Sequence, residues 1–232
     1  MIQGGNILKH YFTHEQPECL VEDWPGKYET FSWLEFGITV PNPIYLVTTL
    51  KEGDIPNGNL QSWGLLLGEG NNNHFLMALL KHHHTYANIK RTGEWCVNYI
   101  SKEYIRQVNA TIINNGIETD EITSSGLTIM PSKIIKTPSV SESKVVLECV
   151  LKWEKSLVEN SNWCLVCGEI VQVAIDDSVL AVKPEDRIDA MGLMYNIRGT
   201  VNPINGDYHG PNTYGLIGDI IHYLPGSDEF LT

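Results

Sequence analysis

The sequence predicts a mainly β fold, an antiparallel β-barrel with a few helices. β-branched and apolar runs recur between segments rich in glycine, proline and asparagine, which is typical of strands joined by turns. The strand runs are too uniformly apolar for a sheet with one face in water, so we expect strands covered on both faces, as in a barrel or at a dimer contact. Helical segments are few and do not alternate regularly with the strands, which argues against βαβ units.

The first strands are expected after the proline-rich break at residues 41–43. Turn residues gather at 51–58 and 68–73. These turns separate three predicted strands, at 44–50, 59–67 and 74–80.

A helix is expected to follow the third strand. Thr85 is a good N-cap, Lys90 and Arg91 suit the last turn, and Gly93 suits a left-handed residue after the helix end. A second helix is expected after Ser101.

The second half of the chain continues the β pattern. We expect a bend or bulge at Gly168 and, from Asp189 onward, a surface segment with little regular structure. The remaining predicted strands are 95–100, 127–130, 144–153 and 163–175.

Charge and composition exclude several functions. The chain has 28 acidic against 16 basic residues and a formal net charge of −12, so its field repels polyanions, and we expect neither nucleic acid nor an anionic membrane as a partner. No apolar run approaches the ~20 residues of a membrane span. The first residues show no secretory signal pattern, and the five cysteines are an odd, sparse set. We therefore expect a cytoplasmic protein with buried thiols.

The densest group of basic and imidazole side chains ends at the predicted helix start. Lys81, His82, His83 and His84 precede Thr85, and a helix N-terminus offers free N–H groups and the positive end of a dipole. This combination is typical of a phosphate site. A solvated strand end is the alternative, and the residues alone leave both open. A metal site is disfavoured because adjacent residues of a strand point to opposite faces.

Two other motifs have simple structural explanations. Cys164 and Cys167 form a C-x-x-C, but no second cysteine pair accompanies them and the context is a strand, so we predict buried structural cysteines. The polar run 59–63 could hydrogen-bond a flat polar ring with Trp63 nearby. From these residues alone, an edge strand facing water is the preferred interpretation.

Taken in order, the segments resemble the flavin reductase-like, FMN-binding split-barrel family, and within it the flavoredoxin branch. The most specific piece is T-Y-x-N-I-x-x-T-G-E-x-x-V-N at 85–98, followed by L-E-C at 147–149 and G-E-I-V at 168–171. The segment 214–218 resembles the tyrosine-glycine stretch that closes such domains. The resemblance covers residues 41–220.

The resemblance implies an antiparallel six-stranded split β-barrel, a homodimer, and FMN bound non-covalently near the subunit boundary. It gives the barrel domain as 41–220 and leaves a C-terminal tail at 221–232. The interleaved aromatic and turn residues of 1–40 indicate an N-terminal arm that packs on the body. The residues that it places around the isoalloxazine ring are Asn59, Leu60, Gln61, Ser62 and Trp63. Those that it places at the phosphate are Lys81, His83, His84 and Thr85, with Tyr214 approaching from the C-terminal segment.

The function implied by the resemblance is that of an FMN-dependent oxidoreductase or electron carrier. NADH or NADPH is the candidate electron donor, and a redox partner protein is a candidate acceptor. The first alternative is a non-catalytic module that binds a flavin or another planar phosphate ligand. The second is a metal-binding β protein that uses the histidine triplet.

Overall fold

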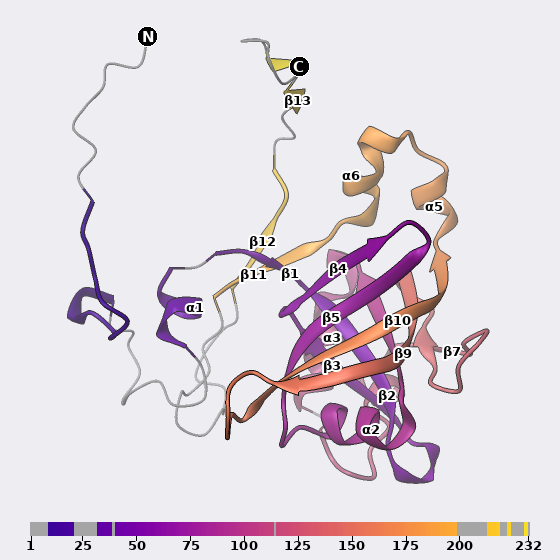
Figure 1. Cartoon of the computed structure of the whole chain (residues 1–232). Helices are drawn as coiled ribbons and strands as arrows, with labels where there is room; N and C mark the ends of the chain where they lie inside the picture. The colour runs from indigo at the N-terminus through magenta and orange to yellow at the C-terminus, as the bar shows by residue number, and fades with distance from the viewer. Residues whose placement is uncertain are drawn as a thin grey trace. The chain divides into compact units, whose positions relative to one another are not determined.

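The computed structural model describes residues 9–20, 32–38, 40–113, 115–198, 213–218, 222–223 and 230–231 (Figure 1). The chain divides into two compact units, 1–40 with 197–213, and 41–196 with 214–232. In the first unit, η1 (Glu18–Leu20) precedes α1 (Trp33–Gly37). A capping box starts α1, with Ser32 and Glu35 satisfying each other's backbone N–H groups. Much of the predicted arm and tail lies outside the described residues, so their roles stay predictions.

A large antiparallel sheet dominates the second unit, which confirms the mainly β fold class. Its strands run in the order β3-β2-β6-β9-β10-β5-β4 (Figure 1). Their bounds are β2 Tyr45–Leu50, β3 Pro56–Gln61, β4 Gly64–Glu69, β5 Asn72–Leu80, β6 Glu94–Ile100, β9 Ser143–Ser156 and β10 Trp163–Ile175.

A two-residue link gives this sheet its barrel form. β3 and β4 are the two edges of the sheet, yet only Ser62 and Trp63 separate them in sequence. The Trp63 carbonyl accepts the Ala78 N–H at 2.9 Å, which ties the link to β5. The sheet must therefore curl until its edges meet at this corner, which is the split-barrel arrangement.

The same link corrects the expected strand 59–67. The chain changes edges at Ser62–Trp63, so that run forms the end of β3 and the start of β4, and the main sheet of the described residues has seven strands where six were expected. The predicted turn 51–58 is also shorter. Asn57 and Gly58 lie within β3, where they pair with Thr49 and Thr48.

The second unit also contains several short elements. The strand β11 (Met194–Arg198) pairs with β1 (Asn42–Pro43), so the expectation of little regular structure after Asp189 was wrong. The other short strands are β7 Ile129–Met130, β8 Ser139–Val140, β12 Thr213–Leu216, β13 His222–Tyr223 and β14 Phe230–Leu231. The helices of this unit are η2 Glu52–Asp54, α2 His84–Thr92, η3 Lys102–Tyr104, α3 Ile105–Ile113, α4 Glu121–Ser124, α5 Asp177–Leu180, η4 Pro184–Asp186 and α6 Arg187–Met191. Among the described residues, no helix has both the length and the apolar character of a membrane span.

The helix α2 begins two residues earlier than predicted. Its N-cap is His83, whose side chain makes no capping hydrogen bond, and Thr85 lies inside the first turn, so the N-cap prediction for Thr85 was wrong. The Thr85 hydroxyl is engaged with β3, and this tertiary contact takes the place of a local cap. Gly93 ends the helix with a φ of 73°, as predicted.

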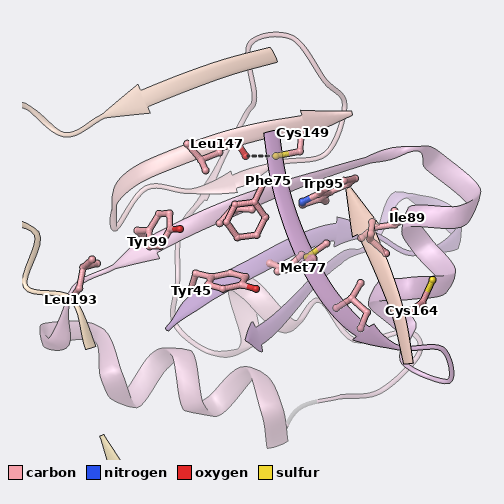
Figure 2. Close-up of a cluster of buried hydrophobic side chains, with 14 residues drawn as sticks. Tyr45, Phe75, Met77, Ile89, Trp95, Tyr99, Leu147, Cys149, Cys164 and Leu193 are labelled. Atoms are coloured by element: carbon pink, nitrogen blue, oxygen red, sulfur yellow. Dashed lines mark hydrogen bonds between the residues drawn. The ribbon is translucent and has the colours of Figure 1, made fainter. Parts of the chain in front are cut away.

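The main core lies against one face of the sheet (Figure 2). Trp95, Phe75 and Tyr45 are its largest fully buried side chains, and the Tyr45 and Phe75 rings meet edge to face at 5.1 Å. Cys164 packs in this core and Cys167 is also buried; both are free thiols, which confirms the structural interpretation of the C-x-x-C.

Two glutamates of the predicted family motifs have structural roles. The carboxylate of Glu148 accepts the backbone N–H groups of residues 133–135 at 2.7–3.2 Å. That of Glu94 accepts the Lys136 N–H at 2.9 Å. Acceptor-only carboxylates thus hold the loop between β7 and β8 against β6 and β9.

Gly168 lies at a register shift between β9 and β10, which confirms the predicted bulge. A Cβ at this position would lie 2.3 Å from Cη2 of Trp95. The indole ring of Trp95, which is fully buried, therefore occupies the space that a side chain would need.

We predict that Gly168→Ala lowers the free energy of unfolding by about 1–3 kcal/mol, because the added methyl group overpacks the core. Chemical denaturation measures this change. Trp95→Phe in the same background should recover part of the loss, since the smaller ring makes room. Gly218→Ala, where a Cβ meets nothing within 4 Å, is the control. Equal effects at positions 168 and 218 would refute the packing argument.

Candidate functional site

Three amide side chains line one face of β3. Because strand residues alternate, Asn57, Asn59 and Gln61 share a face. Asn59 Nδ2 donates to the Thr85 hydroxyl at 2.9 Å, Asn57 Nδ2 donates to the same oxygen at 3.3 Å, and Gln61 Nε2 donates to Asn59 Oδ1 at 3.0 Å. The amide face of β3 therefore meets the first turn of α2.

The sequence interpretation did not include Asn57, which was assigned to a turn. Its spacing of two from Asn59 and of four from Gln61 was the signal that could have placed it on the same face.

A buried ion pair holds β3 in place. Glu121 Oε2 accepts the Gly58 N–H at 2.9 Å, and Glu121 Oε1 accepts from Lys51 Nζ at 2.7 Å. Lys51 also donates to the carbonyls of Gly116 and Thr119. Burial raises the pKa of Glu121, and the hydrogen bonds from Lys51 and Gly58 oppose that shift. A fully hydrogen-bonded buried pair of this kind defines the position of the strand.

Two buried polar atoms at this corner have no hydrogen-bond partner. They are Gln61 Oε1, on β3, and His84 Nδ1, on the first residue of α2. Buried polar atoms are nearly always paired, and an exception calls for an explanation such as a missing ligand. These two atoms mark the corner between β3 and α2 as the candidate site.

The imidazole of His83 is neutral at physiological pH. Its pKa is lowered from 6.5 to about 4, first by burial and then by the neighbouring His82 and His84. The rings of His82 and His83 meet edge to face at 4.7 Å. A neutral imidazole can donate one hydrogen bond to an anion without contributing positive charge.

Lys81 faces the turn between β9 and β10. Its Nζ donates to Ser156 Oγ at 2.8 Å and to the Ser161 carbonyl at 2.6 Å. An ammonium has three donors, so these two acceptors leave one N–H for a ligand.

The link residues lie beside other parts of the same unit. Ser62 Oγ accepts from Asn196 Nδ2 at 3.2 Å. The Trp63 ring meets the Trp163 ring edge to face, with 5.1 Å between centroids. An indole pair at the junction of the sheet edges offers an aromatic wall next to the amide face.

Two of the predicted site residues lie away from the amide face, Leu60 on β3 and Tyr214 on β12. Leu60 and Tyr214 both pack against the second core cluster, which includes Val108 of α3. The Tyr214 hydroxyl donates to Asn109 Oδ1 of α3 at 2.7 Å. The structure thus brings Asn59, Gln61 and Thr85 together, whereas the side chains of Leu60 and Tyr214 face α3.

The histidine triplet forms no metal centre in this structure. Across residues 40–113 and the other described ranges, no three His, Cys, Asp or Glu side chains are grouped so that they could hold a metal ion.

Comparison with protein families assigns the chain. Residues 38–199 match the model of the "Flavin reductase like domain". The chain belongs to the flavin reductase-like family. Membership supports a flavin-related oxidoreductase, and the family model spans the candidate site from β3 to α2.

Individual proteins are also similar to this chain. An uncharacterized protein of Aquifex aeolicus is 27% identical over 172 residues, which is 70% of this chain and 83% of the relative. Nitrilotriacetate monooxygenase component B from Bacillus cereus has a similar structure, with a TM-score of 0.74 at 21% identity over 94% of this chain and all of that one. Flavoredoxin of Desulfovibrio vulgaris (Miyazaki F) gives 0.64 at 21% identity over 82% of this chain and 93% of that one. At these identities the two structures establish the split-barrel fold alone.

The pKa of His83 predicts a pH dependence of stability. The folded protein holds this imidazole neutral down to about pH 4, whereas the unfolded chain takes up the proton near pH 6.5. The free energy of unfolding should therefore fall as the pH drops from about 6.5 to about 4. Urea unfolding across this range measures the slope, and His83→Gln should reduce it. A slope that His83→Gln leaves unaltered would contradict the assignment.

Proposed function

We propose that the protein binds FMN non-covalently and acts as an oxidoreductase or electron carrier of the flavin reductase and flavoredoxin type. The observation that carries this proposal is the polar corner between β3 and α2. There, Gln61 Oε1 and His84 Nδ1 are buried without partners in a chain of the flavin reductase-like family. Such atoms fit a ligand rich in hydrogen-bonding groups.

The first turn of α2 suits the phosphate. Its free N–H groups and the helix dipole favour an anion. The Thr85 hydroxyl lies in this turn, the neutral His83 precedes it, and Lys81 retains one N–H. Phosphate oxygens are strong acceptors and would use each of these donors.

The end of β3 and the link suit the flavin ring. We assign the ring to the segment 59–63, where Gln61 offers an unpartnered acceptor and Trp63 an aromatic surface. When bound, the isoalloxazine supplies the hydride or electron chemistry, and the protein supplies position, polarity and access. Backbone N–H groups in this segment would stabilise negative charge on the reduced ring. NADH or NADPH is the proposed donor, and a redox partner protein the proposed acceptor.

A non-catalytic binding module is the second candidate function. It is favoured by the state of Glu121, a buried carboxylate beside β3 that is bound to Lys51 and Gly58 and so is not free to act as an acid or base. Anaerobic addition of NADH or NADPH to FMN-loaded protein separates the two functions. Bleaching of the flavin band supports the reductase, and its absence with both donors supports the binding module.

We propose a homodimer that uses the edge strand β4. Leu65, Leu66 and Leu67 are 52%, 57% and 42% exposed on this edge. Three consecutive exposed leucines on an edge strand mark a surface that another chain covers.

The five free thiols support a reducing compartment, and we assign the protein to the cytoplasm.

We expect FMN to bind to the purified protein with a shifted flavin spectrum and quenched fluorescence. Thr85→Val removes one phosphate donor, so it should weaken FMN binding about tenfold or more. Titration of the apoprotein with FMN, followed by fluorescence, measures the dissociation constant of the wild type and that of Thr85→Val. Wild-type protein that gives no spectral change at saturating FMN would refute the proposal.

We expect Leu66→Asp to convert the dimer to a monomer, because a carboxylate cannot be buried in an apolar interface without a partner. Light scattering after size exclusion gives the mass. Ile113→Asp, at an 83% exposed position at the end of α3, is the matched control and should leave the dimer intact. A wild-type protein with the mass of one chain would contradict the assignment.

A further inference from the structure

The hydrogen bonds around the Thr85 hydroxyl leave it able to donate a hydrogen bond but not to accept another. A hydroxyl has two lone pairs and one hydrogen. Both lone pairs are used, by Asn59 Nδ2 at 2.9 Å and Asn57 Nδ2 at 3.3 Å. Thr85 is only 1% exposed, and in the part of the chain that the structure describes no group accepts its hydrogen. The hydroxyl is therefore left as a donor.

Another threonine of α2 shows the usual alternative. Thr92 donates its hydroxyl hydrogen to the Asn88 carbonyl four residues earlier, at 2.9 Å. Such a bond to the helix backbone is common for helical threonines. Thr85 differs because it is the second residue of α2, so no helical carbonyl lies four residues before it, and the amides of β3 reach its oxygen.

Gln61, two residues further along β3, sets the orientation of the Asn59 amide. Gln61 Nε2 donates to Asn59 Oδ1 at 3.0 Å, so the Asn59 NH₂ group points to Thr85. Gln61 is 6% exposed, and its Oε1 has no partner. The series Gln61, Asn59, Thr85 thus has an unused acceptor at one end and an unused donor at the other.

We propose that Asn59 and Gln61 are positioning residues that hold the Thr85 hydroxyl as a donor to a phosphate ester, and so set a preference for FMN over riboflavin. This inference rests on the proposed function, because it assigns the phosphate of the proposed cofactor to the donor end. The acceptor at Gln61 Oε1 takes an N–H or O–H group of the same ligand. The phosphate oxygens only accept, so a hydroxyl held as a donor matches them.

The test compares FMN with riboflavin, which lacks the phosphate. Dissociation constants for both are measured by fluorescence titration of wild type, Asn59→Ala, Thr85→Val and the double variant. Each single variant should lower the ratio of riboflavin to FMN dissociation constants about tenfold or more. Because Asn59 acts through Thr85, the double variant should lose no more than Thr85→Val alone.

Three further variants separate positioning from folding. Asn88→Ala removes a matched contact, since Asn88 Nδ2 donates to Thr49 Oγ1 at 3.0 Å between the same helix and the neighbouring strand. It should leave the ratio unchanged. Thr85→Ser should also retain the ratio, because it keeps the hydroxyl. Asn59→Asp is nearly isosteric, but its carboxylate accepts the Thr85 hydrogen, so the preference for FMN should be lost in a folded protein.

Several outcomes would overturn the inference. One is a double variant in which the effects of Asn59→Ala and Thr85→Val on the ratio of dissociation constants add. Another is an equal loss of affinity for FMN and for riboflavin in Asn59→Ala and Asn59→Asp. A wild-type protein that binds both flavins equally would also overturn it while leaving the proposed flavin function standing. A wild-type protein that binds neither would refute the proposed function itself.

Discussion

The two-residue link at Ser62–Trp63 is the constraint on which the rest of the second unit depends. It joins the opposite edges of a seven-stranded sheet, so the sheet has to curl back on itself. The amide face of β3 consequently meets the start of α2, which follows the end of β5 on the far side of the sheet order. A longer link would let the edges separate, and the polar corner would have no reason to form.

Polar groups in this unit fall into two classes that differ in how they are satisfied. The carboxylates of Glu121, Glu148 and Glu94 each accept hydrogen bonds from backbone N–H groups, and Glu121 also faces Lys51. These groups are consistent with structural roles, because burial of a charge is costly unless it is fully bonded. Gln61 Oε1 and His84 Nδ1 are buried without any such bond. Four other buried atoms of the described residues also lack a partner, namely Tyr45 Oη, Trp95 Nε1, Ser125 Oγ and Thr137 Oγ1. The proposed ligand position is supported because two such atoms lie on β3 and at the start of α2.

The structure also explains why the segment from Lys81 to His84 carries less positive charge than its sequence indicates. Burial and two neighbouring imidazoles lower the pKa of His83 to about 4, so it carries no charge at neutral pH. Lys81 donates two hydrogen bonds to the turn between β9 and β10. The proposed binding of a phosphate here would therefore rely on oriented dipoles, namely the N–H groups of α2 and the Thr85 hydroxyl, more than on net charge.

Local pattern by itself determined strands β2, β5, β6, β9 and β10, the helix end at Gly93, the bulge at Gly168 and the buried role of Cys164 and Cys167. Each of these follows from nearest-neighbour sterics or from apolar periodicity, which act within a few residues. The family resemblance, and not the local pattern, pointed to Lys81 to Thr85 and to Asn59 to Trp63 as the candidate site. Only the tertiary structure decided that the run 59–67 changes edges, that Thr85 bonds to β3 instead of capping α2, and that Leu60 and Tyr214 face α3. Those outcomes depend on which segments meet when the sheet closes, and contacts between residues distant in sequence leave no signature in the local pattern.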